Sequence, residues 1–144
     1  MLRDSFGRKV DYLRLSVTDR CDLRCVYCMP PEGIPLKPVS EILTYDELVR
    51  TVRVAAALGV RKVRITGGEP LARRGIVSFV RQVAAVPGVL DLAMTTNGTA
   101  LPGMAAPLRE AGLSRVNVSL DTIRRDRYAE ITRRDALPRV LSGI

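Results

Sequence analysis

Apolar and polar residues alternate along four short segments of the chain, and this alternation predicts β-strands. The segments are residues 12–18, 62–68, 91–98 and 115–121. A period of two places successive side chains on opposite faces of a sheet, so one face should be apolar and the other polar. The chain is therefore expected to contain a sheet with one face against helices and one polar face.

A helical period follows each of these segments. Thr44 and Glu47 form a capping-box pattern that predicts the start of the first helix, and Gly59 predicts its end. Apolar residues spaced at i, i+3, i+4, i+7 and i+8 across residues 76–84 predict the second helix. The first half of the chain therefore alternates strand and helix.

Weaker patterns predict two later helices. Residues 104–111 should form the third, with Pro107 in its first turn, where a proline costs no hydrogen bond. Residues 124–134 should form the fourth. Short links between alternating strands and helices require parallel strands and right-handed crossovers. The pattern predicts an α/β fold, either a doubly wound sheet or part of a barrel.

The two faces of the predicted sheet differ in what they should contact. The apolar positions are Leu13, Leu15, Val17, Val63, Ile65, Leu92, Met94, Val116, Val118 and Leu120. The polar positions are Arg14, Ser16, Thr18, Arg64, Thr66, Thr95, Asn97, Asn117, Ser119 and Asp121. Because helices usually cover both faces of a parallel sheet, a polar face is unusual. We expect it to line a ligand cavity; an open, water-covered face is the alternative.

Length and composition indicate one globular domain over residues 1–144. Apolar residues make up 47% of the chain, which is enough to build a core. No apolar run is long enough to cross a membrane, and charges occupy the amino-terminal positions where a signal peptide would be apolar. We therefore expect a cytoplasmic protein with no membrane partner.

The formal net charge of +8 comes almost entirely from arginine, because only Lys9, Lys37 and Lys62 are lysines. Arginine suits bidentate contacts to phosphate or carboxylate, so an anionic ligand is indicated. Solvated helix faces are the alternative explanation for most of these arginines. A nucleic-acid-binding module is disfavoured, because aromatic residues are few and no basic run occurs.

The three cysteines of the chain, Cys21, Cys25 and Cys28, have the spacing C-x3-C-x2-C directly after the first predicted strand. An odd number of thiols in the cytoplasm argues against a disulfide framework. A structural zinc site needs four protein ligands, and the chain has no histidine. Three thiolates on a four-iron cluster would leave one iron open, which is a catalytic feature.

The cysteine motif, with Tyr27 before its last cysteine, and "GGEP" at residues 67–70 resemble the radical S-adenosylmethionine (radical SAM) enzymes. The resemblance implies a 4Fe-4S cluster held by Cys21, Cys25 and Cys28. S-adenosylmethionine would chelate the fourth iron and contact Tyr27, Gly68 and Ser119. Such enzymes cleave S-adenosylmethionine to a 5′-deoxyadenosyl radical that abstracts hydrogen from the substrate. The implied fold is a partial TIM-type barrel, of which these would be the first four units.

Five longer segments, including "KVRITGGEPLARRGI" and "RVNVSLD", closely resemble the GTP 3′,8-cyclase family of molybdenum cofactor biosynthesis. The resemblance implies conversion of GTP to (8S)-3′,8-cyclo-7,8-dihydroguanosine 5′-triphosphate, a lyase reaction. By motif position, Arg14, Arg64 and Thr95 would contact GTP. The family also implies a homodimer and an electron donor such as flavodoxin or ferredoxin.

Members of that family are longer, and three further cysteines near their carboxyl end hold a second 4Fe-4S cluster. We therefore expect this chain to be an amino-terminal part that is inactive by itself. One rival interpretation is another radical SAM enzyme that acts on a peptide or small molecule. A metal-containing nucleic-acid-binding module is a second rival, from a different class.

Overall fold

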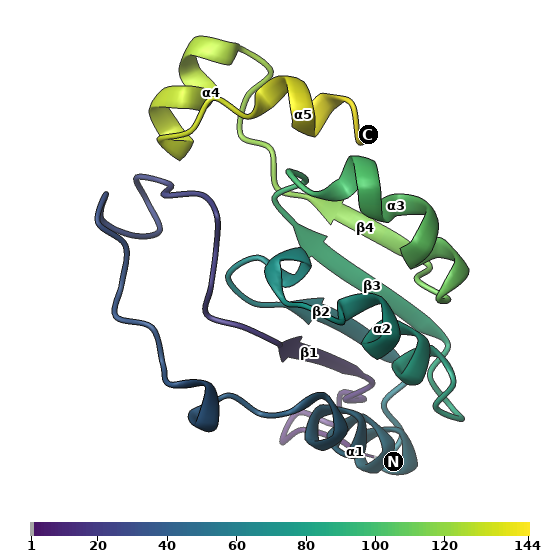
Figure 1. The fold of residues 1–144 in the computed structure, drawn as a ribbon. Coiled ribbons are helices and arrows are strands. Elements are labelled where there is room, and N and C mark those ends of the chain that lie inside the picture. Colours follow the sequence, from purple (N-terminus) through teal and green to yellow (C-terminus); the bar gives the residue numbers. More distant parts are fainter. Residues whose placement is uncertain (1) are drawn as a thin grey trace.

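The computed structural model describes residues 2–144 and contains one four-stranded parallel sheet (Figure 1). The strands are β1 (Tyr12–Ser16), β2 (Lys62–Thr66), β3 (Asp91–Thr96) and β4 (Arg115–Val118). Their order in the sheet is β1-β2-β3-β4, and every neighbouring pair is parallel. The structure confirms all four predicted strands and their parallel pairing.

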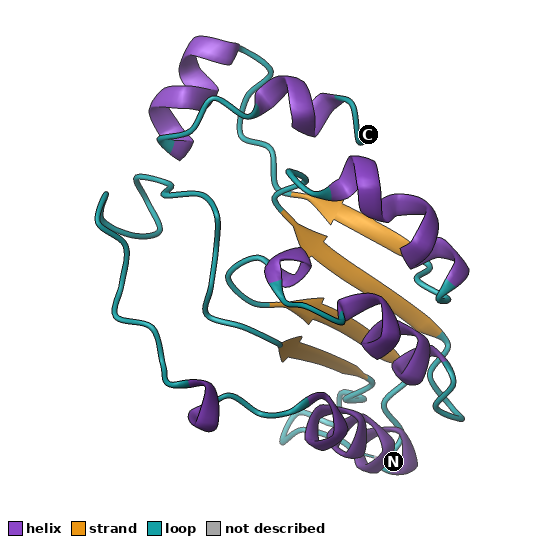
Figure 2. Cartoon of the chain, in the orientation of Figure 1, coloured by secondary structure: helices purple, strands orange, loops and turns teal. Residues whose placement is uncertain are grey.

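Helices cover one face of this sheet (Figure 2). They are α1 (Tyr45–Ala57), α2 (Ile76–Ala84) and α3 (Leu101–Glu110), with α4 (Arg125–Thr132) and α5 (Leu137–Leu141) beyond the carboxyl end of β4. Two single turns of 3-10 helix, Val39–Glu41 and Pro70–Ala72, lie in the loops. A doubly wound sheet has helices on both faces and a reversal of strand order. The arrangement is therefore that of a barrel segment.

The apolar positions of the first three strands pack against α1, α2 and α3 in a single core. Its buried strand residues include Leu15, Val63, Ile65 and Met94. Phe79 of α2 lies at the centre of the helical side and is fully buried. This confirms the face that the alternation predicts to be apolar in β1, β2 and β3.

In β4 the expected burial is wrong for Val116, which is 37% exposed. The strand lies at the edge of the sheet, where β3 is its single neighbouring strand within residues 2–144. Val118 packs against the main core, whereas Leu120 contacts a second, smaller cluster around Tyr128. The fourth strand is therefore less completely buried than its sequence indicates.

The capping box at the start of α1 is confirmed, because the Thr44 hydroxyl accepts from the Glu47 N–H and the Glu47 carboxylate accepts from the Thr44 N–H. In α3 the placement of Pro107 in the first turn is wrong. The helix begins at Leu101, which is buried in the core, so Pro102 occupies the first turn and Pro107 lies inside the helix. Burial of Leu101 outweighs the local cost of an interior proline.

The carboxyl-terminal part of the chain differs from the expectation in two ways. Helix α4 ends at Thr132, two residues early, because Arg133 adopts a left-handed conformation with φ of 55° and ψ of 26°. Helix α5 follows, although no helix is predicted there. Its residues Leu137 and Val140 pack against Tyr128 of α4. A five-residue helix is too short to show a period in the sequence.

The polar face of the sheet is open in the part of the chain that the structure describes. Arg14, Ser16, Asn117 and Ser119 are exposed, whereas Arg64, Thr66 and Thr95 are half-buried. Thr18, another of the predicted polar positions, is buried. This face is therefore partly exposed, and the residues on it do not by themselves enclose the expected cavity. Among residues 2–144, we find no helix whose length and apolar character would let it cross a membrane.

Candidate functional site

The three cysteines lie on one loop, which we name the cysteine loop (residues 18–29), at the carboxyl end of the strands. The Cys28 and Met29 N–H groups both donate to the Cys25 carbonyl, at 2.9 and 3.1 Å, so that Cys25 and Cys28 flank a tight turn. All three thiols are free; Cys21 and Cys25 are half-buried and Cys28 is exposed. The structure therefore gathers the thiols where parallel α/β folds place their active sites.

Burial raises the pKa of the Cys21 thiol above its ordinary value, and nearby carboxylates, led by Asp22, add to that shift. Burial likewise raises the pKa of Cys25, while the neighbouring Tyr27 hydroxyl opposes the shift. A raised pKa favours the protonated form of both thiols in the ligand-free chain. A metal centre that binds them must displace those protons.

Gly67 and Gly68 allow the cysteine loop to lie against the end of β2. Gly67 has a φ of 149°, and a Cβ there would lie 2.6 Å from the Thr18 carbonyl oxygen. A Cβ on Gly68 would overlap the Arg20 carbonyl oxygen and lie 2.8 Å from that of Asp19. The Gly68 N–H donates to the Thr18 carbonyl at 2.7 Å. The two glycines therefore allow the chain's own loop to pack closely against the end of β2. The contact of Gly68 with S-adenosylmethionine stays a prediction.

Glu69, the acidic residue of "GGEP", is almost fully buried at 1% exposure. Its Oε1 accepts hydrogen bonds from the Leu71 N–H at 2.9 Å and the Thr96 hydroxyl at 2.7 Å. Its Oε2 accepts from the Asn97 N–H at 2.7 Å. Burial raises the pKa of this carboxyl, while the three donors oppose the shift. The carboxylate therefore joins the end of β2 to the end of β3.

Asn97 continues this network to the cysteine loop. Its side-chain amide donates to Asp22 at 2.7 Å and to the Cys21 sulfur at 3.8 Å. The other Asp22 oxygen accepts from the Thr99 hydroxyl at 2.6 Å. A hydrogen bond to sulfur is weak, but the Asp22 contacts are short and charge-assisted. The first cysteine is thus held against the end of β3.

Replacing Glu69 with glutamine is expected to destabilise the chain by about 2 kcal/mol, because one amide nitrogen would face an N–H or O–H donor where an oxygen now accepts. Urea unfolding of the purified chain measures this free energy. The matched control is Glu110→Gln, which changes an exposed carboxylate at the end of α3. Equal stability of the two variants would contradict the role assigned to the buried carboxylate.

Tyr27 connects the cysteine loop to the end of β4. Its hydroxyl donates to Asp121 at 2.9 Å, although the side chain as a whole is 66% exposed. Burial of the hydroxyl and this hydrogen bond both raise the pKa of Tyr27. Ser119 is exposed nearby, and its N–H donates to the Thr96 carbonyl at 2.8 Å. The structure therefore places Tyr27, Gly68 and Ser119 at the same end of the sheet as the thiols.

The two candidate arginines lie side by side on the polar face, because Arg14 of β1 pairs in register with Arg64 of β2. Neither forms an ion pair within residues 2–144. The Nε of Arg64 is buried without a hydrogen-bond partner, and its guanidinium lies 5.8 Å from the centre of the Tyr12 ring. Thr95 lies on the same face of β3 and is half-buried. Two arginines at adjacent strand positions, neither of them neutralised by a carboxylate in the described part of the chain, favour an anionic ligand.

No three His, Cys, Asp or Glu side chains within residues 2–144 lie close enough together to hold one metal ion. This spacing disfavours a single zinc ion bound by the three thiols. A four-iron cluster takes each thiolate on a different iron, so its ligands need not converge on one point. Three free thiols on one loop therefore suit a 4Fe-4S cluster better than a single ion.

Three residues of this site have no predicted role in the sequence: Glu69, Asp22 and Thr99. The sequence does contain a signal for a buried role of Glu69. This carboxylate follows two glycines at the end of a predicted strand and precedes an apolar stretch. Asn97 is predicted as a polar position, but its contacts with the cysteine loop are not. No local pattern indicates these contacts, because their partners are about 75 residues apart in the chain.

Comparison with known proteins identifies the family to which this chain belongs. The model of the radical SAM superfamily matches residues 15–144. GTP 3′,8-cyclase of Geobacter sulfurreducens is 57% identical over 143 residues, which are 99% of this chain and 44% of that protein. Molybdenum cofactor biosynthesis protein 1 of Drosophila melanogaster is 52% identical over 99% of this chain and 25% of that protein. The chain spans less than half the length of these curated relatives.

Among solved structures, the fold resembles Streptococcus suis SuiB bound to S-adenosylmethionine, with a TM-score of 0.62 and 23% identity. The alignment covers 84% of this chain and 27% of that chain. An identity this low shows the fold alone. The four strand-helix units are therefore the first units of a partial TIM-type barrel, as the resemblance implies.

Proposed function

Because this chain belongs to the radical SAM superfamily, we propose that it forms the cluster-binding and S-adenosylmethionine-binding part of a GTP 3′,8-cyclase. Its similarity to GTP 3′,8-cyclases extends over 99% of its residues and supports this reaction. The substrate would be GTP and the product (8S)-3′,8-cyclo-7,8-dihydroguanosine 5′-triphosphate, on the route to the molybdenum cofactor. Since the relatives are more than twice as long, the activity of the whole enzyme needs residues outside this chain.

Cys21, Cys25 and Cys28 are the proposed ligands of a 4Fe-4S cluster with one open iron. When bound, the cluster supplies the electron for reductive cleavage of S-adenosylmethionine. The chain's own contribution is to hold the three thiols apart at the carboxyl end of the sheet. The Asn97 and Asp22 contacts orient the first thiol, and the turn at Cys25 orients the other two.

Tyr27, Gly68 and Ser119 are the proposed contacts of S-adenosylmethionine, with the Tyr27 ring against its adenine. The Tyr27–Asp121 hydrogen bond supports this assignment, because it fixes an exposed aromatic ring beside the thiols. The exposed position of Ser119 leaves its hydroxyl free for a ligand. These three residues come from three different segments that meet at one end of the sheet.

Arg14, Arg64 and Thr95 are the proposed contacts of GTP. The observation that carries this assignment is the pair of arginines at adjacent strand positions, Arg14 and Arg64, which have no carboxylate partner within residues 2–144. A triphosphate would neutralise both charges and supply an acceptor for the buried Arg64 Nε. A peptide substrate would not require two unpaired arginines at this place.

The remaining parts of the proposal follow from the family. A second 4Fe-4S cluster, an electron donor such as flavodoxin or ferredoxin, and a homodimer belong to the whole enzyme. We place the chain in the cytoplasm, because three free thiols suit a reducing compartment. The 144 residues should bind S-adenosylmethionine without cyclising GTP, because the polar face is open to water.

Titration of the purified chain with GTP tests the substrate. We expect Arg14→Ala to weaken GTP binding by about 10- to 100-fold, because a hydrogen bond to a charged group is worth about 1.5–3 kcal/mol. Arg53→Ala, an exposed arginine of α1, is the matched control and should bind like the unmodified chain. Equal weakening by both variants would indicate nonspecific charge attraction. Cyclised GTP from the 144-residue chain alone would overturn its proposed dependence on further residues.

A further inference from the structure

We propose that Arg133 is a positioning residue that clamps the turn carrying Cys25 and Cys28. The inference rests on the proposed function, which assigns these thiols to a cluster. Nη1 of Arg133 donates hydrogen bonds to the carbonyl oxygens of Arg24 and Met29, both at 2.9 Å. Arg24 directly precedes Cys25, and Met29 directly follows Cys28. One nitrogen atom therefore closes the turn at both of its ends.

The backbone before Arg133 holds the same turn. The N–H of Arg24 donates to the Thr132 carbonyl at 3.0 Å, and the N–H of Val26 donates to the Ile131 carbonyl at 2.8 Å. We name residues 131–133 the strap. The strap lies along the cysteine loop, although more than a hundred residues separate the two segments in the sequence. Main-chain and side-chain contacts thus converge on the part of the loop that carries two of the three thiols.

The conformation of Arg133 is a second, independent observation. Within residues 2–144 it is the only non-glycine residue with a positive φ, at 55°. Side chains with a Cβ disfavour this region, and glycine is the usual residue where a helix ends in it. Such conformations persist where the surrounding contacts over-determine them. The backbone conformation at position 133 favours glycine, but the residue there is an arginine. Its guanidinium holds the cysteine turn.

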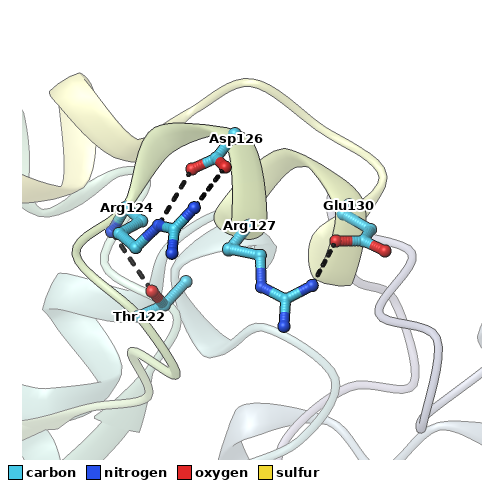
Figure 3. A network of polar contacts seen from close by, with 5 residues as sticks. All are labelled: Thr122, Arg124, Asp126, Arg127 and Glu130. Atoms are coloured by element: carbon cyan, nitrogen blue, oxygen red, sulfur yellow. Dashed lines mark hydrogen bonds and ion pairs between the residues drawn. The ribbon is translucent and has the colours of Figure 1, made fainter.

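Two other arginines, Arg124 directly before α4 and Arg127 within it, behave differently (Figure 3). Arg124 pairs with Asp126 at 2.8 Å, and Arg127 pairs with Glu130 at 3.1 Å, both on the exposed surface of the helix. Arg133 is half-buried, and its two hydrogen bonds go to main-chain carbonyls of the cysteine loop. Arg127 is therefore a matched control, because this arginine lies within α4, the helix that directly precedes Arg133, and has no hydrogen bond to that loop within residues 2–144.

The clamp has a physical consequence for cluster binding. A guanidinium is a planar, rigid group, so two hydrogen bonds from its Nη1 restrict how far the ends of the turn can separate. A turn that is ordered before the cluster binds loses less conformational entropy on binding. Contacts that orient metal ligands typically change metal affinity by about 10- to 100-fold. Arg133 should accordingly strengthen retention of the cluster.

Hydrogen exchange on the ligand-free chain tests the clamp directly. Arg133→Gly removes the guanidinium and relieves the left-handed conformation, so unfolding of the whole chain is not expected. Amide exchange within residues 24–29 should become about tenfold faster than in the unmodified chain. Arg133→Lys keeps the charge but lacks the rigid fork, and should show a similar increase. Arg127→Ala should exchange like the unmodified chain, and equal exchange in all variants would overturn the clamp.

Anaerobic reconstitution with iron and sulfide tests the link to the cluster. We expect the unmodified chain and Arg127→Ala to retain iron equally under a chelator, and Arg133→Gly to lose it about tenfold faster. The EPR signal of the reduced cluster should also differ in Arg133→Gly. Identical retention and spectra in that variant would overturn the inference alone. Failure of the unmodified chain to take up iron would overturn the proposed function, and this inference with it.

Discussion

A chain carrying Cys25→Ala is expected to lose the 4Fe-4S cluster completely. Anaerobic reconstitution of the unmodified chain should yield about four irons per chain, with an EPR signal that changes when S-adenosylmethionine is added. The variant should hold less than about one iron and show no such signal, because two thiolates leave two irons without a protein ligand. Iron analysis and EPR spectroscopy measure both effects.

The matched control for this result is Val26→Ala, the next residue along the loop. Its side chain is 53% exposed, and its backbone contact with Ile131 does not depend on the side chain. This variant should load like the unmodified chain. A cluster of normal iron content and unchanged spectrum in Cys25→Ala would show that the ligand assignment is wrong. Zinc without iron in the unmodified chain would instead favour a structural metal site.

Gly68→Ala is expected to destabilise the chain by about 3 kcal/mol. The added Cβ would overlap the Arg20 carbonyl oxygen and crowd that of Asp19, both of which are main-chain atoms that cannot rotate away. Relief of the clash would break the hydrogen bonds from Gly68 to Thr18 and from Glu69 to Arg20, both at 2.7 Å. Urea unfolding, followed by circular dichroism, measures the loss of stability.

Gly103→Ala is the matched control, because an added methyl group at this glycine is expected to stabilise the chain instead of destabilising it. A Cβ on Gly103 meets nothing within 4 Å, and the residue lies inside helix α3. Alanine is a better helix former than glycine, so this variant should be about 0.5 to 1 kcal/mol more stable. Equal effects of the two substitutions would mean that the cysteine loop does not pack closely against β2 in solution.

The strands, the first two helices and the polar face were predictable from local patterns. A period of two follows from strand geometry, and Thr44 with Glu47 forms a capping box within four consecutive residues. The same period predicts Arg14 and Arg64 as polar positions, and the structure pairs them in register. The positions of the thiols after β1 followed from the sequence as well.

Other features depended on contacts between distant segments. Pro107 lies inside α3 because Leu101 is buried in the core, and burial is not visible in the local pattern. Val116 is exposed because β4 forms an edge. Helix α5 packs on Tyr128 and has no period of its own. In each case tertiary packing outweighed a local preference.

By itself, the sequence determined an α/β chain with a cysteine loop after its first strand and a polar sheet face. Backbone geometry sets the spacing of apolar residues in strands and helices, so these elements can be predicted from neighbouring residues in the sequence. Only the tertiary structure showed that Gly67 and Gly68 admit the chain's own loop, that Glu69 joins two strand ends, and that Arg133 holds the cysteine turn. Those roles depend on contacts between residues that are far apart in the sequence, and no local sequence pattern predicts such contacts.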